Sequence, residues 1–160
     1  MLLGGVKAIL YSRARAVHDA TPGPVQLRHA ETEWGSFTRW IVYESRADTV
    51  TAYRVNALSG EITLLVQLPR GLDDPLALRS RELGTVRNLR AAHGVTFAVV
   101  ASAGPDRREV LWSDLRYCRP ASASNVSCAL WFGGEFDPAA DAFSVAVVRV
   151  GGFEQRRAVR

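Results

Sequence analysis

The feature that most limits the fold is a series of short segments in which apolar and polar residues alternate. A period of two is typical of a β-strand that buries one face. Residues 61–68 show it best, with a row of four apolar side chains on one face: Ile62, Leu64, Val66 and Leu68. Two connections in this part of the chain, residues 46–48 and 58–60, are short enough for hairpins. After the break at residues 21–24, the sequence therefore predicts an antiparallel meander with one buried face.

Eight segments are predicted as strands, in two groups of four on either side of a helical stretch. The first group is 25–31, 38–45, 49–56 and 61–68, and the second is 95–102, 109–117, 127–132 and 142–150. The helical stretch covers 75–93, where Asp74 suits the N-cap, Pro75 suits the first turn and Gly84 is a point of division. This order predicts an α+β domain, mainly an antiparallel, curved β-sheet, with one central helical segment and an N-terminal helix.

The chain divides into an N-terminal helix over 1–21, a single β-rich domain over 22–153 and a flexible polar tail over 154–160. The apolar stretch at the N-terminus, residues 1–11, is shorter than the roughly 20 residues that span a bilayer. Because Arg13 and Arg15 follow it, the segment is typical of the cytoplasmic end of a membrane helix. A short amphipathic helix packed on the domain explains the residues equally well, and both interpretations stay open here.

The basic residues are almost all arginines, since Lys7 is the only lysine among 20 Lys and Arg residues. Arginine favours phosphates and nucleic acids because its planar guanidinium donates two parallel hydrogen bonds. Nucleic-acid-binding surfaces gather such charge on one face or in one run, whereas here the arginines are dispersed and alternate with acids. The distribution argues against a nucleic-acid partner and predicts solvated faces and ion pairs.

Residues for catalysis or metal binding are scarce. The three histidines lie in separate predicted elements: His18, His29 and His93. The sequence contains no His-x-His or His-Glu-x-x-His spacing and no Gly-x-Ser-x-Gly motif. We therefore predict no metal site and no cofactor in this chain, and the catalytic residues stay unknown. Gly133 and Gly134 are interpreted as a turn at a strand end.

One polar group stands out on the predicted strand 109–117. Alternation places Trp112, Asp114 and Arg116 on the same face. A carboxylate and a guanidinium beside an indole can line a pocket, or they can form a structural ion pair that holds the sheet to the helix. The structural interpretation is favoured, because such networks also occur far from active sites.

The two cysteines, Cys118 and Cys128, end segments that face each other if they form a hairpin. A disulfide between them would close a loop of about ten residues and persist only in an oxidising compartment. If the basic N-terminal segment marks a cytoplasmic location, both thiols stay reduced and pack in the core. Both possibilities stay open at this stage.

Four segments together resemble a known family: Gly4–Lys7 before a basic helix, Arg39–Glu44, Trp112–Cys118 and Cys128–Asp137. The chain is similar to the carboxy-terminal region of the YdjM-like membrane-bound metal-dependent hydrolases, also described as LexA-binding, inner-membrane-associated hydrolases. The resemblance implies an accessory soluble domain without a metal site of its own. The catalytic part would lie in membrane helices absent from this chain.

The resemblance also implies the partners and the location. The partners would be membrane helices of a parent or neighbouring protein, and the location would be inner-membrane-associated or cytoplasmic, with the periplasmic side left open. The alternative is a free-standing module that binds a small ligand or a protein partner. A deep apolar cleft with converging polar groups would favour this alternative.

Overall fold

The computed structural model describes residues 8–9, 11–13, 24–92 and 94–159. The first half forms a four-stranded antiparallel sheet, here sheet A, in the order β1-β2-β3-β4. Its strands are β1 (Leu27–Thr32), β2 (Arg39–Ser45), β3 (Thr49–Asn56) and β4 (Ile62–Pro69). The predicted meander is confirmed, because each strand pairs with its neighbour in sequence through a short connection. The predicted apolar row on residues 61–68 is only partly buried: Val66 and Leu68 are in the core, whereas Ile62 and Leu64 are exposed, because the register with β3 shifts at Leu65.

Two short helices, α2 (Pro75–Ser80) and α3 (Gly84–Ala92), occupy the predicted helical stretch. The Asp74 carboxylate accepts hydrogen bonds from the backbone nitrogens of Leu76, at 2.7 Å, and Ala77, at 3.4 Å, and Pro75 begins the helix. These contacts satisfy nitrogens that have no partner inside the first turn. The stretch divides just before Gly84, as its sequence allows.

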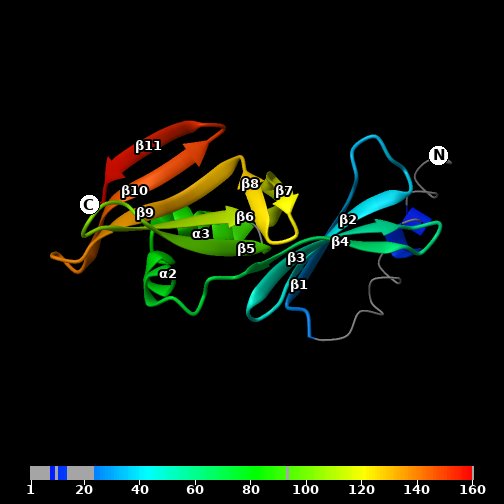
Figure 1. Cartoon of the computed structure of the whole chain (residues 1–160), viewed down its shortest axis with the longest axis horizontal. Helices are drawn as coiled ribbons and strands as arrows, with labels where there is room; N and C mark the ends of the chain where they lie inside the picture. Colours follow the sequence, from blue (N-terminus) through cyan, green and yellow to red (C-terminus); the bar gives the residue numbers. More distant parts are fainter. Residues whose placement is uncertain (1–7, 10, 14–23, 93, 160) are drawn as a thin grey trace.

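The second half forms a five-stranded antiparallel sheet, sheet B, in the order β11-β10-β9-β6-β5. Its strands are β5 (Thr96–Ser102), β6 (Arg108–Asp114), β9 (Leu130–Asp137), β10 (Ala142–Val150) and β11 (Phe153–Ala158). A small hairpin of β7 (Cys118–Ser122) and β8 (Asn125–Cys128) follows the 3-10 turn η1 (Leu115–Tyr117). The sheets lie side by side along the long axis, with the hairpin between them (Figure 1). The α+β class with mainly antiparallel sheet is confirmed.

Sheet B differs from the prediction in three places. The predicted strand 109–117 ends at Asp114, where η1 begins, so Arg116 is not on the strand face assigned to it. The predicted strand 127–132 is the end of β8 and the start of β9. The polar tail from Glu154, expected to be flexible, pairs with β10 as the edge strand β11.

Gly133 and Gly134 lie in the middle of β9 rather than in a turn. A Cβ atom on Gly133 would stand 1.8 Å from the backbone oxygen of Val110 on β6. Only glycine lets the two strands approach this closely. The sequence predicts a turn at these two glycines because the residues next to them in the chain do not show that β6 packs against them.

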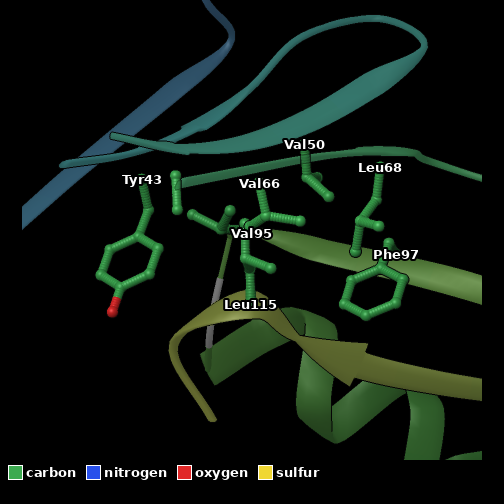
Figure 2. Close-up of a cluster of buried hydrophobic side chains, with 8 residues drawn as sticks. Tyr43, Val50, Val66, Leu68, Val95, Phe97 and Leu115 are labelled. Carbon is green, nitrogen blue, oxygen red and sulfur yellow. The ribbon is translucent and has the colours of Figure 1, made fainter. Parts of the chain in front are cut away.

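The main core lies where sheet A meets the first part of sheet B (Figure 2). From sheet A come residues such as Tyr43 and Val66, and from the other side come Val95, Phe97 and Leu115. A second core lies between the two helices and sheet B, around Trp112. The main core joins the two halves of the chain, so the placement of one half against the other depends on apolar burial.

The N-terminal helix predicted over 1–21 falls mostly outside the described residues. Residues 8–9 and 11–13 are helical, and the ring of Tyr11 contacts that of Trp40 on β2, with the centroids 5.3 Å apart. Among the described residues, no helix combines the length and apolar character that crossing a bilayer requires.

Candidate functional site

A cleft of about 1030 Å³ opens at the end of the main core. Its floor is apolar and is formed by side chains of sheet A and η1: Ile41, Ala52, Leu65, Val66 and Leu115. The β1–β2 connection, residues 33–38, forms one rim, and Cys118–Pro120 at the start of β7 form the opposite wall. The cleft therefore lies between sheet A and the β7–β8 hairpin, which lies between β6 and β9 in the chain.

Two aromatic side chains on the β1–β2 connection line the mouth of the cleft. Trp34 is 98% exposed and Phe37 is 79% exposed. A ring of this kind normally buries 150–250 Å² on folding, and neither ring does so here. Two neighbouring exposed rings beside an apolar floor form a surface that gains free energy when a ligand covers it.

The backbone of this connection is held in place although its aromatic side chains are exposed. The backbone nitrogen of Glu33 donates to the oxygen of Arg39 at 2.9 Å, and that of Ser36 donates to the oxygen of Glu33 at 3.0 Å. The Glu33 carboxylate accepts from Arg54 on β3 at 2.7 and 2.9 Å and pairs with Arg39 at 3.0 Å. These contacts tie the base of the loop to sheet A and fix where the two rings are presented.

A phenol and a carboxylate add polar groups to the wall. The Tyr43 hydroxyl donates to Oε1 of Glu31 at 2.8 Å. Burial raises the pKa of Tyr43 well above its ordinary value, and the hydrogen bond and charge of Glu31 raise it further. The phenol therefore stays protonated at neutral pH and acts as a hydrogen-bond donor rather than as a base.

Arg119 contributes a positive charge to the opposite wall. Its side chain is exposed, and among the described residues it has no carboxylate within ion-pair distance. By contrast, Arg54, which also lines the cleft, is paired with Glu33. An acidic group on a ligand would thus find an uncompensated cation at this wall.

The structure separates Trp112 from the other two residues of the predicted polar face. Trp112 faces the helices, where its Nε1 donates to Oγ of Ser80 at 2.7 Å and the Arg90 guanidinium lies 5.7 Å from its ring centroid. Asp114 and Arg116 form a pair with Nη2–Oδ2 at 2.7 Å. All three lie outside the set of residues that line the cleft.

The Asp114–Arg116 pair also shapes the chain locally. Asp114 is fully buried, and its Oδ1 accepts from the backbone nitrogen of Arg116 at 2.9 Å, which caps η1. The hydrogen bonds that the Arg116 guanidinium donates to Asp114 hold the pKa of Arg116 above its ordinary value. The pair fixes η1, from which Leu115 reaches the cleft floor.

Cys118 and Cys128 face each other across the β7–β8 hairpin and are joined by a disulfide. Both side chains pack against the main core, and Cys118 lines the cleft. The bond therefore holds one wall of the cleft in register with the strand behind it.

Sequence reasoning missed most of the residues that form this site: Glu31, Trp34, Phe37, Tyr43 and Arg119. One signal was present in the chain itself. Trp34 and Phe37 flank Gly35 and Ser36 in a turn-like segment between two predicted strands. Aromatic residues in such a connection have no strand face on which to be buried, which could have marked them as a surface feature.

Within the part of the chain that the structure describes, no three His, Cys, Asp or Glu side chains gather closely enough to hold a metal ion. Comparison with protein-family models, with curated proteins and with solved structures found no match to this chain.

Proposed function

We propose that this protein is a binding module whose cleft takes a small molecule with an aromatic or other apolar body and an acidic group. The observation that carries the proposal is the pair of exposed rings, Trp34 and Phe37, at the mouth of an apolar cleft. The volume of about 1030 Å³ is at the upper end of the usual range for small-ligand sites.

The rings supply the apolar part of the binding energy. If a ligand covers about 80 Å² of one ring, the transfer free energy is about 2 kcal/mol at roughly 25 cal/mol per Å². Because the loop backbone is already fixed by Glu33 and its two arginine partners, little of this energy is lost in ordering the loop.

The polar groups supply the orientation. Arg119 favours an anionic group on the hairpin side of the cleft. On the sheet side, the Tyr43 hydroxyl is already hydrogen-bonded to Oε1 of Glu31, and Oε2 of Glu31 lies 4.0 Å from Nε2 of His29. The acidic group of the ligand is therefore favoured beside Arg119 rather than beside the Glu31 carboxylate. A ligand with its acidic group near the β7–β8 hairpin and its ring beneath the β1–β2 connection would contact both sides of the cleft.

The proposal is tested with the fluorescent anion 1-anilinonaphthalene-8-sulfonate. We expect saturable binding with quenching of tryptophan emission, and an affinity about 30-fold weaker in Trp34→Ala, which corresponds to ~2 kcal/mol. Phe153→Ala is the matched control, since Phe153 is also exposed but lies on β11. Absence of binding, or equal losses in the two variants, would refute the proposal. Retention of binding in the tryptophan variant would place the ligand elsewhere.

The accessory role implied by the YdjM-like resemblance stays a prediction beside this proposal. In such a protein the cleft would serve a domain attached to membrane helices, and hydrolysis would take place outside this chain. The DNA upstream of the first codon tests it. Membrane helices with clustered histidines encoded there would support the accessory role, and an isolated reading frame would count against it.

A further inference from the structure

The last strand of sheet B has an open edge. β11 lies at the outer side of the sheet, and all of its residues are exposed (Figure 1). Two other edge strands bond to segments outside their sheets. The backbone nitrogen of Gln67 on β4 donates to the oxygen of Ala123 at 2.9 Å, and that of Ala98 on β5 donates to the oxygen of Arg70 at 3.0 Å. Among the described residues, no such bond reaches the outer side of β11, so this edge can accept another strand.

The pairing of β11 with β10 decides which of its backbone groups point outward. The backbone nitrogen of Val159 donates to the oxygen of Ser144 at 3.0 Å, so these two residues form a hydrogen-bonded pair. Such pairs alternate with non-hydrogen-bonded pairs along an antiparallel ladder. By this alternation, the backbone groups of Glu154, Arg156 and Ala158 point away from β10 and toward the open edge.

The open edge carries opposite charges on one face of the sheet. Glu154 and Arg156 are two residues apart, so their side chains lie on the same face. Nε of Arg156 donates to Oε1 of Glu154 at 2.6 Å, and Nη1 donates to Glu135 on β9 at 2.6 Å. The Glu154 side chain is still 36% exposed and that of Arg156 41% exposed. Both charges are therefore held in place and remain accessible to a second strand.

We propose that β11 pairs with β11 of a second copy of this chain, in antiparallel orientation about a twofold axis at Gln155. In this register Glu154 of one copy lies opposite Arg156 of the other, and the outward backbone groups of the two strands meet. The two copies of sheet B then form one continuous sheet, with an ion pair on either side of the axis. This interface is independent of the function proposed for the cleft.

The charges favour this register and this partner. A shift by one residue would set outward backbone groups opposite groups that are already bonded to β10. A shift by two would set Glu154 opposite Glu154, or Arg156 opposite Arg156, and like charges directly opposite each other destabilise a strand pair. Charged residues on an edge usually oppose pairing. A second β11, whose charges match in one register, therefore fits this edge better than a strand of arbitrary sequence.

Cross-linking tests the register. The two copies of Gln155 would form a non-hydrogen-bonded pair with Cα atoms roughly 4.5 Å apart, which is within reach of a disulfide. Gln155→Cys should therefore give covalent dimers on mild oxidation, since Cys118 and Cys128 are already joined to each other. Arg157→Cys is the matched control, because it is exposed on the same face of β11 but its two copies would stand roughly 14 Å apart along the strands.

Sedimentation velocity measures the association without a cross-link. Because one short strand per copy is a small interface, we expect the average mass to rise from one chain toward two only as the concentration approaches about 1 mM. The dimer should be about tenfold weaker in Glu154→Arg, which sets like charges opposite each other. Glu61→Arg is the control, since it makes the same charge change at an exposed residue just before β4. Circular dichroism verifies that each variant is folded.

Three results would overturn the proposal: the mass of a single chain at every concentration, equal cross-linking of Gln155→Cys and Arg157→Cys, or equal association of Glu154→Arg and Glu61→Arg. The first of these would mean that the edge stays open or takes a strand of another protein. If Glu154→Arg does not fold, the comparison of the two cysteine variants still decides the matter, because neither removes an ion pair of the network around Arg156.

Discussion

Replacement of Asp114 by alanine removes the acceptor of a buried ion pair and the cap of η1 in one step. The Asp114 side chain is fully buried, and that of Arg116 is 19% exposed. The variant leaves the guanidinium without the hydrogen bonds at 2.7 and 3.0 Å that Asp114 accepts from it. Removal of one partner from a buried pair costs roughly 3–5 kcal/mol. Because Arg116 retains some access to water, we expect a loss of about 3 kcal/mol.

The assay is equilibrium unfolding in urea, followed by tryptophan fluorescence and by circular dichroism. In a thermal melt of a chain of this size, a loss of about 3 kcal/mol in the free energy of unfolding corresponds to a decrease in Tm of roughly 6–12 °C. Asp114→Asn separates the two effects, since an amide oxygen can still cap η1 but carries no charge.

Glu154→Ala is the control, because its carboxylate pairs with Arg149 and Arg156 at the surface. Both arginines keep Glu109 as a partner in that variant, so its cost should stay below about 1 kcal/mol. Equal unfolding midpoints for Asp114→Ala and wild type would show that Arg116 relaxes into water and would refute the reasoning.

Three further predictions concern single sites. Gly133→Ala should lower the free energy of unfolding by about 3 kcal/mol or prevent folding, because a Cβ atom there would lie 1.8 Å from the backbone of β6. Gly84→Ala is the control in the same urea assay and should be neutral or stabilising, because Gly84 is at the start of a helix with open space around it. Reduction of the Cys118–Cys128 bond should lower the free energy of unfolding by about 2–3 kcal/mol, and unfolding curves with and without a dithiol that coincide would contradict this. The raised pKa of Tyr43 means that the unfolded chain loses its phenolic proton first, so stability should be full below pH ~10 and fall above it. In Tyr43→Phe, the free energy of unfolding should fall less above pH ~10 than in the wild type. If it falls equally in both proteins, groups other than Tyr43 cause the loss of stability at high pH.

The strands of sheet A could be predicted because their signal is local. Period-two alternation follows from burying one face of a strand, and the Asp74–Pro75 start of α2 follows from contacts within one turn. Both depend on residues close together in the chain. The role of Gly133 could not be predicted in this way, because it depends on a backbone atom of β6, which is distant from Gly133 in the sequence.

The candidate site shows the same division. By itself, the sequence determined an antiparallel α+β chain, dispersed arginines and two cysteines able to face each other. Only the tertiary structure decided that Trp34 and Phe37 border a cleft closed by Cys118–Pro120. The physical reason is that apolar burial between the two halves of the chain brings distant segments together. Local alternation specifies which face of a strand is buried, but it does not specify which other segment covers that face.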